Sequence, residues 1–508
     1  MNGPDRPLPR PLAILVPVLI AGVVLAFYWC MARGMVLAAV LVALLPLAAL
    51  LFSRLNTVFA LLIVLAGADL YIPGFASELT LLDFFGLALL LILAFYASFT
   101  GKARPAGQAL HPILILLFFA VMGLTIAVRG FGFRQLGGGK IGGMSYVRLF
   151  TVLGLYLVAG PVYLTPRQWR LALLSYCFVA LLPAVADMTY VFSGGKFFQL
   201  YQVVKPSPTV LSTLDVLRSG QGILRLKRLP GVDVVLLSLL LFRWRGPGKM
   251  PIILLTFLGI FLAGLTGFRL RLISIMLFVG VFVFVSAKNR RILTVVKFVG
   301  AVLALLLVAA IFASRLPVAV NRAMSWIPFL DVSREAEISA YGTTAWRLRL
   351  WQQMIDIAPH YLLVGRGFAF SPYDLSEVMP FVGIDRYDLA VALATHNYHN
   401  GPLGLLLDLG VAGLVVGMLV LIIPAFGVYR ATREPWHDQR LALCYRLLLA
   451  KFAALLAVFV LIYGDTRLMP REMLLLLLFL ERLRASDTRL AEAQASIAGD
   501  AATGKPKP

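Results

Sequence analysis

The sequence predicts an all-α polytopic membrane protein with about 12–14 transmembrane helices and one large, partly helical loop on one side of the bilayer. The chain of 508 residues is 60% hydrophobic and only 14% charged, whereas soluble domains carry roughly 25% charged residues. It contains repeated apolar runs of about 20 residues, which is the length that a helix needs to cross a bilayer core. Because that core contains no water, each run must satisfy its own backbone hydrogen bonds, and helices do so.

Fourteen apolar runs are candidates for these helices. The first resembles a signal peptide, but no small-residue cleavage site follows it, so we expect a retained helix. The eighth and the last are short and could instead be re-entrant or interfacial helices. The runs cover residues 12–29, 34–52, 57–72, 80–99, 111–128, 147–164, 170–192, 231–243, 250–267, 270–287, 292–313, 403–426, 446–463 and 471–483.

Basic loops give the orientation of the chain. If all fourteen runs span the bilayer, every Lys- and Arg-rich loop falls on the same side as both termini. Short cytoplasmic loops accumulate Lys and Arg, so this side is predicted to be the cytoplasm. These loops are residues 101–104, 167–170, 243–249, 288–291 and 430–446.

The opposite side holds the longer connections, above all residues 314–402. Residues 315–400 contain seven Lys and Arg and eight Asp and Glu, and residues 346–357 have a helical pattern. Loops of this length are usually functional or folded. The chain is therefore divided into an N-terminal transmembrane bundle (1–230), a core that includes the loop 314–402 (231–430), C-terminal transmembrane helices (431–485) and a disordered tail (486–508).

The net charge of +22 is explained by the basic cytoplasmic loops. No nucleic-acid recognition motif accompanies it, so we expect no nucleic-acid partner. The three cysteines lack metal-ligand spacing, and two histidines three residues apart make a weak metal site without Cys or Glu nearby. No nucleotide-binding motif is present. We expect no metal and no cofactor, and an activated substrate would have to come from the membrane.

The most informative segment is residues 395–402, Thr-His-Asn-Tyr-His-Asn-Gly-Pro. Gly401 and Pro402 are typical of a helix start, which places His399 at the outer end of a transmembrane helix. The positive end of that helix favours a neutral imidazole that can accept a proton. Gly410 and Gly413 lie one turn apart, where a neighbouring helix can approach closely. The alternative is that these His and Tyr side chains merely lie at the headgroup level.

Arginine is also found on the predicted outer side, where the accumulation of Lys and Arg in cytoplasmic loops does not explain it. Arginine binds phosphate oxygens in a bidentate manner, so three such clusters indicate an anionic ligand at the membrane surface. Contact with lipid phosphates is the alternative, and it explains one cluster more easily than three. The clusters lie at residues 224–231, 266–271 and 345–349.

Carboxylates within or at the ends of the spans need partners, because charge is costly in lipid. Asp233 follows Arg228 by five residues and could orient it. Asp408 lies nine residues after His399, about 13 Å along a helix, so a direct contact is not expected. Both are interpreted as structural. The full set is Asp69, Asp83, Asp187, Asp233 and Asp408.

Taken together, these motifs resemble the bacterial O-antigen ligase and polymerase family. Its signature is His-[Asn/Ser/Gln], nine residues, then Gly-x-x-Gly. His399 and Asn400 fit it with Gly410 and Gly413, whereas His396 does not, because leucine stands at the offset of the first glycine.

Two further segments carry the resemblance. Residues 349–359, followed by a Gly-Arg-Gly at 365–367, resemble the loop segment of the family. Residues 266–269 resemble its Thr-Gly-Ser-Arg element, with Phe268 in place of Ser. The resemblance covers roughly residues 220–430.

The resemblance implies a metal-independent, inverting glycosyltransferase at the periplasmic face of the bacterial inner membrane. It would move a glycan from undecaprenyl diphosphate to a saccharide on lipid A core (a ligase) or to a second lipid-linked repeat (a polymerase). His399 would be the general base. Arg269, with Arg228 or Arg225, would hold the diphosphate, and Asn400 would position the His loop; Arg271 is interpreted as structural. The candidate substrate contacts are Arg225, Arg228, Arg269, Arg347, Arg349 and Asn400.

Two alternatives stay open at this point. The sequence does not distinguish a ligase from a polymerase. A transporter or flippase of an anionic lipid-linked saccharide is the alternative from another class. Transport would need a polar path through the membrane, and charges in the middle of the spans are sparse.

Overall fold

The computed structural model describes most of the chain from residue 55 onward. The described residues are 55–71, 80–100, 105–107, 112–132, 142–204, 226, 228–243, 249–287, 291–312, 315–327, 330, 332–369, 392–393 and 395–503. The first two predicted spans, at 12–29 and 34–52, lie outside this set.

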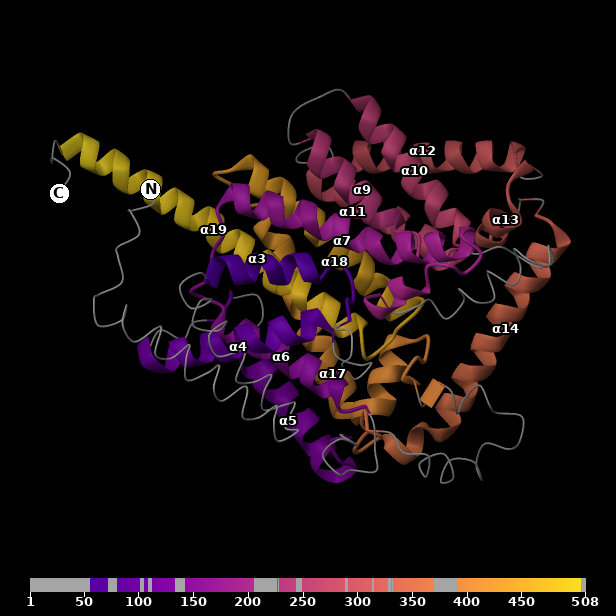
Figure 1. Cartoon of the computed structure of the whole chain (residues 1–508), viewed down its shortest axis with the longest axis horizontal. Coiled ribbons are helices and arrows are strands. Elements are labelled where there is room, and N and C mark those ends of the chain that lie inside the picture. The colour runs from indigo at the N-terminus through magenta and orange to yellow at the C-terminus, as the bar shows by residue number, and fades with distance from the viewer. Residues whose placement is uncertain are drawn as a thin grey trace.

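The described chain is helical, and the predicted all-α membrane fold is confirmed (Figure 1). Among the described residues, seven helices are long and apolar enough to cross a membrane, and four shorter apolar helices accompany them. All twelve predicted spans from residue 57 onward coincide with a helix. The helices of the bundle are α3 (Leu55–Leu65), α4 (Leu81–Thr100), α5 (Pro112–Arg129), α6 (Met144–Val158), α7 (Pro166–Phe192), α9 (Gly231–Ser238), α10 (Lys249–Leu265), α11 (Arg269–Ser286), α12 (Arg291–Ile311), α17 (Gly401–Ala431), α18 (Gln439–Leu461) and α19 (Met469–Thr503).

Short non-α turns join or extend some of these helices. A π-helical turn, η3 (Leu239–Arg243), continues α9, and a 3-10 turn, η2 (Phe198–Gln202), follows α7. The short span predicted at 231–243 is therefore an α-helix that ends in a π turn.

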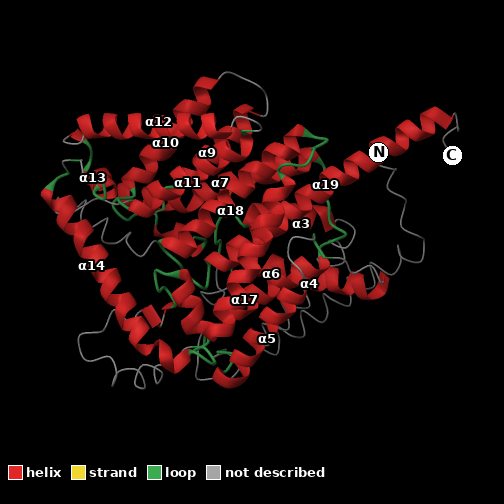
Figure 2. Ribbon diagram, turned by 180° about the vertical axis from the view of Figure 1, so that it is seen from behind, coloured by secondary structure: helices red, strands yellow, loops and turns green. Residues whose placement is uncertain are grey.

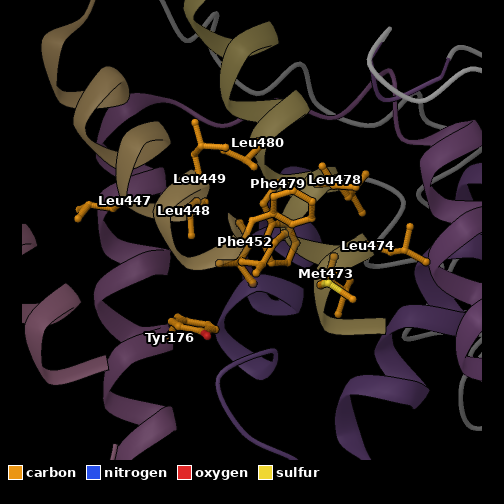
Figure 3. Close-up of a cluster of buried hydrophobic side chains, with 14 of the residues drawn as sticks. Tyr176, Leu447, Leu448, Leu449, Phe452, Met473, Leu474, Leu478, Phe479 and Leu480 are labelled. Carbon is orange, nitrogen blue, oxygen red and sulfur yellow. The ribbon is translucent and has the colours of Figure 1, made fainter. Parts of the chain in front are cut away.

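The centre of the bundle is formed by α18 and α19. Phe452 of α18 and Phe479 of α19 are fully buried, and they pack among leucines of both helices with Tyr176 of α7 nearby (Figure 3). Phe479 also meets Phe59 of α3 edge-on at 5.8 Å between ring centroids. The large apolar side chains of α18 and α19 are buried in the bundle. Helices at the outside of the bundle expose such side chains.

Helix α12 shows the opposite burial. Its most apolar window, residues 292–311, has no buried residue. In water such a surface would drive aggregation, whereas in a bilayer it faces lipid. The exposure of α12 therefore fits the membrane setting that the fold requires.

The described part of the long connection between α12 and α17 is partly helical, as predicted. It contains α13 (Val318–Met324), the long helix α14 (Arg334–Ile357) and a 3-10 turn, η5 (Ala358–Tyr361). Ser333 caps α14 by accepting a hydrogen bond from Ala336 N at 3.4 Å. Both views place α14 along one edge of the molecule (Figures 1 and 2).

The carboxylates of the spans have partners. Asp83 binds Arg148 of α6 at 2.8 Å and Arg471 of α19 at 3.0 Å. Asp233 binds Lys451 of α18 at 3.0 Å, which agrees with its interpretation as structural. Arg228 lies 3.9 Å from Asp187.

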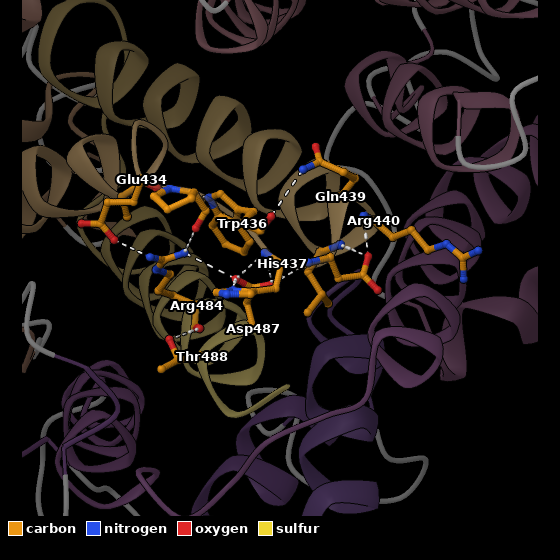
Figure 4. Close-up of polar contacts among 12 residues, drawn as sticks. Glu434, Trp436, His437, Gln439, Arg440, Arg484, Asp487 and Thr488 are labelled. Carbon is orange, nitrogen blue, oxygen red and sulfur yellow. Dashed lines mark hydrogen bonds and ion pairs between the residues drawn. The ribbon is translucent and has the colours of Figure 1, made fainter. Parts of the chain in front are cut away.

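The last helix corrects one expectation. Residues 486–503 are helical and continue α19 beyond the bundle (Figure 1), where the sequence suggested a disordered tail. Its first part is anchored: buried Asp487 accepts hydrogen bonds from the backbone N–H groups of His437 at 3.2 Å and Asp438 at 2.9 Å (Figure 4). Alanine, glutamate and arginine, good helix formers, then propagate the helix from this anchor.

Candidate active site

Four arginines and His399 line a single cavity, which we call the cationic cavity. Its volume is about 320 Å³. The wall combines the first turn of α11, one face of α14, the loop before α17 and the ends of α18 and α19. The polar and aromatic groups on it include Arg269, Arg271, Arg322, Arg347, Thr343, Thr344, Asn397, His399, Tyr463 and Glu472. A concave site with this excess of guanidinium groups suits a multiply charged anion.

The turn between α10 and α11 presents two of these arginines. Gly267 has a positive φ of 68°, which glycine adopts at little cost. The Thr266 hydroxyl accepts a hydrogen bond from Phe268 N at 3.2 Å and so closes the turn. The helix then starts at Arg269, and its first turn brings both Arg269 and Arg271 to the cavity.

Helices α13 and α14 supply the other two arginines of the cationic cavity. Buried Arg322 of α13 donates to Thr343 Oγ1 at 2.8 Å and to Ser339 Oγ at 3.0 Å, both on α14, and to the carbonyl of Gly267. It therefore ties the 266–268 turn to α14. Across the cavity wall, Arg269 donates to Thr344 Oγ1 at 3.1 Å.

Arg347 of α14 is held in a cationic environment. Burial lowers the pKa of its guanidinium, the nearby charge of Arg269 lowers it further, and Tyr463 opposes the shift. Its Nε is buried and has no hydrogen-bond partner among the described residues. A buried donor without a partner costs free energy, and an anion in the cavity would relieve that cost.

The His399 ring lies between two aromatic side chains. Trp346 of α14 meets it at 5.2 Å between ring centroids, and Tyr463 meets it at 4.8 Å. Both contacts are edge-to-face, a favoured geometry for aromatic pairs. The imidazole is thus fixed in orientation while it lines the cavity.

Asn400 and Gly401 start the helix behind this histidine. Helix α17 begins at Gly401 with Pro402 in its first turn, as predicted. The Asn400 side chain accepts a hydrogen bond from Leu403 N at 3.0 Å and so caps the helix. Asn400 is an N-cap that fixes the loop carrying His399.

Gly410 has a different role from the one predicted, which was the close approach of a neighbouring helix. Gly410 is a kink inside α17, with φ 73° and ψ −174°, and the chain that approaches it is the extended segment 362–367. Arg366 N donates to Leu407 O at 2.7 Å, Gly367 N to Asp408 O at 2.8 Å, and Val411 N to Leu362 O at 2.8 Å. The kink frees these peptide groups from the helix, and the segment satisfies them.

The remaining predicted residues are dispersed. Arg349 lies on the exposed face of α14, and Arg225 lies outside the described residues. Among the described residues that line the cationic cavity, Arg228 and Arg349 do not occur. The structure therefore brings together His399, Arg269 and Arg347 from the predicted set.

Other lining residues were not singled out from the sequence. Arg322 is one of them, and Tyr463 and Glu472 come from the segment between α18 and α19 and from α19 itself. Arg271, which was interpreted as structural, also lines the cavity. The polar run at 463–467 between two predicted spans was an available signal, because counting spans places it on the same side as His399.

An apolar cavity of about 450 Å³ lies beside the cationic one, among α10, α11, α12 and α13. Helix α13 separates the two. Its Arg322 lines the cationic cavity, and its Val320 and Met324 line the apolar cavity. Together they form an amphipathic site at the edge of the bundle.

Residues 253–418, about a third of the chain, match the family model described as O-antigen ligase. This region is therefore similar to the O-antigen ligase family. The match runs from α10 to α17 and therefore includes Arg269, Arg322, Arg347 and His399. A search of curated proteins found no match.

The matched region does not contain the whole cavity. Tyr463 and Glu472 lie beyond residue 418, on the part of the chain that follows the match. Ligase- or polymerase-type activity is the function that this family supports, and a multi-pass membrane protein is what the fold provides.

Proposed function

We propose that the protein transfers a glycan from undecaprenyl diphosphate to a saccharide acceptor, with His399 as general base. The observation that supports this most strongly is that His399 and four arginines line one cavity. A general base and an anion-binding surface are the two elements that displacement of a diphosphate needs.

In the proposed step, an acceptor hydroxyl oxygen attacks the anomeric carbon of the donor glycan as the bond from that carbon to the diphosphate oxygen breaks. His399 takes the hydroxyl proton. The diphosphate leaves with the bonding electron pair, and Arg269, Arg322 and Arg347 stabilise its charge without a metal. Attack on the face opposite the leaving group inverts the anomeric centre.

The apolar cavity fits the lipid part of the same donor. A polyprenyl diphosphate is apolar along its chain and anionic at its head, and the two cavities that α13 separates have this same division. The family match favours transfer and gives no support to the transporter alternative.

The proposed setting is the bacterial inner membrane, with both termini in the cytoplasm and the cationic cavity facing the periplasm. The basic loops support this orientation. Labelling of single cysteines introduced at exposed Arg349 and at Arg430 with a membrane-impermeant maleimide tests it. Only the first should react in intact spheroplasts; the reverse pattern contradicts the orientation.

Replacement of His399 by Ala tests the catalytic assignment. We expect the rate of undecaprenyl diphosphate release from a synthetic lipid-linked oligosaccharide to fall by about 10²- to 10⁴-fold. The matched control is His437→Ala, whose ring lies in the distant α17–α18 connection and is half exposed. Full activity of His399→Ala would contradict the assignment.

The same assay addresses the acceptor and the metal. In cells with His399→Ala, accumulation of single lipid-linked repeats would indicate a polymerase, and accumulation of full-length lipid-linked glycan would indicate a ligase. Loss of activity of the purified wild-type protein in EDTA, with recovery on adding a divalent cation, would contradict metal independence.

A further inference from the structure

The loop that carries His399 has a strained backbone. His396 and His399 have φ angles of 53° and 56°, in the left-handed region that costs a residue with a Cβ roughly 1–2 kcal/mol. Neither is glycine, so the surrounding contacts have to hold this conformation. The source of these contacts is a buried carboxylate, Asp408.

Asp408 lies in α17, two residues before the Gly410 kink, and is fully buried. Its Oδ1 accepts hydrogen bonds from His396 Nδ1 at 2.8 Å and from the Tyr398 hydroxyl at 2.5 Å. Its Oδ2 accepts one from the Thr466 hydroxyl at 2.6 Å. A carboxylate can only accept, so the His396 proton resides on Nδ1. One side chain thereby binds two residues of the strained loop and the α18–α19 connection.

A second layer fixes Tyr398. Its hydroxyl accepts a hydrogen bond from Arg366 Nη1 at 3.2 Å, and its carbonyl accepts one from Trp351 Nε1 of α14 at 3.1 Å. Arg366 belongs to the segment that fills the Gly410 kink. The loop is consequently fixed at Tyr398, the residue directly before His399, from both its side chain and its backbone.

The two histidines of the loop therefore have different surroundings. His399 lines the cationic cavity, whereas the His396 side chain is only 1% exposed and faces Asp408. His396 does not line that cavity, so the Asp408–His396 pair has no direct access to a substrate there.

We propose that Asp408, acting through His396 and Tyr398, is a positioning residue that sets the orientation of His399 for proton transfer. This inference rests on the proposed function of His399. Its physical content is that loss of the carboxylate releases the left-handed backbone, and the imidazole moves away from the reacting hydroxyl. A displacement of about 1 Å can lower a rate by about 100-fold, and the arginines that bind the diphosphate stay in place.

The test compares Asp408→Ala with Asp487→Ala. Asp487 is an equally buried aspartate beside a histidine, at the distant α18–α19 contact, so its loss reports the stability cost alone. With purified protein in nanodiscs, we expect Asp408→Ala to lower kcat by about 100-fold, with KM for the lipid-linked donor and binding of undecaprenyl diphosphate within about twofold of wild type. Asp487→Ala should lose comparable thermal stability and keep its kcat. Asp408→Asn, which retains an acceptor oxygen, should recover at least part of the rate.

Tyr398→Phe is the second variant, because it removes a single hydroxyl and preserves the packing. We expect a roughly tenfold lower kcat at unchanged donor KM. Wild-type kcat in both Tyr398→Phe and Asp408→Ala overturns the inference, as does a parallel loss of kcat in Asp408→Ala and Asp487→Ala. If His399→Ala is itself fully active, the proposed function fails instead, so the two failures are distinguishable.

Discussion

In the described part of the chain, two histidine–aspartate pairs lie on or beside α17, α18 and α19, and they differ in distance and in burial. In the pair near the cationic cavity, His396 and Asp408 are 2.8 Å apart and both side chains are buried. In the distal pair, His437 and Asp487 are 3.5 Å apart, and the His437 side chain is 49% exposed (Figure 4). The same residue types thus belong to a closed network in one region and to an open contact in the other.

The difference lies in what each aspartate binds. Asp487 accepts hydrogen bonds from the backbone N–H groups of residues 437 and 438 and so fixes the start of α18 against α19. Asp408 accepts hydrogen bonds from the side chains of His396 and Tyr398. The residue that follows them, His399, lines the cationic cavity. A histidine–aspartate pair therefore indicates function only when its contacts lead to a substrate-accessible group.

An arginine accompanies each pair, and its replacement should give the largest contrast in stability. Arg366 is buried and donates to Tyr398 and to the carbonyl of Leu393. Arg366→Leu should reduce the free energy of unfolding by about 2–3 kcal/mol, because buried acceptors lose their donor. Arg484 is partly exposed and binds exposed Glu434, and its distance to buried Asp487 is 3.5 Å. Arg484→Leu should reduce the free energy of unfolding by less, about 1 kcal/mol. Denaturant titration in detergent measures both; equal losses would contradict the contrast.

Each pair also lies beside a helix cap. Asn400 caps α17 with one hydrogen bond, and Asp438 caps α18 by accepting from Arg440 N at 2.6 Å and Leu441 N at 3.3 Å. Asn400→Ala and Asp438→Ala should each reduce the free energy of unfolding by about 1 kcal/mol. Only Asn400→Ala should also lower the transfer rate, and Asn400→Ser should restore capping. An equal loss of rate in Asp438→Ala would remove the distinction between the two regions.

The smallest expected contrast is in the response to acid. Burial lowers the pKa of His396 below its ordinary value, although Asp408 opposes the shift. Between that lowered pKa and about 6.5, the unfolded chain binds a proton that the folded protein does not, so stability falls as the pH falls. Melting curves from pH 7.5 to 5 should show a smaller acid loss for His396→Gln than for wild type. An identical slope in wild type and His396→Gln would contradict the prediction.

The spans and the start of α17 follow from the sequence because they depend on local properties. Apolar length determines a span, and Gly401 with Pro402 determines a helix start. The distinction of His399 from His396 came from the resemblance to the O-antigen ligase and polymerase signature, through the spacing to Gly410. The reason for that spacing did not follow, since the kink depends on a segment more than 40 residues earlier.

Side-chain partners across helices were not predictable in the same way. Arg228 and Arg349 have the same residue type and predicted side as Arg269 and Arg347, and only helix packing distinguishes them. Arg322, Tyr463 and Glu472 reach the cavity from three different elements. Helical order after Ser486 depended on a tertiary anchor, Asp487, that composition does not reveal.

The kink of α17 has a consequence for how the protein is made. The peptide groups of Leu407, Asp408 and Val411 find their hydrogen-bond partners in residues 362–367, and unpaired peptide groups are costly once a helix leaves water for lipid. A ribosome delivers the chain from its N-terminus, so the complementary segment is already synthesised when α17 is. A circular permutant that places residues 362–367 after α17 would reverse that order, and α17 would then have to insert before its partner exists.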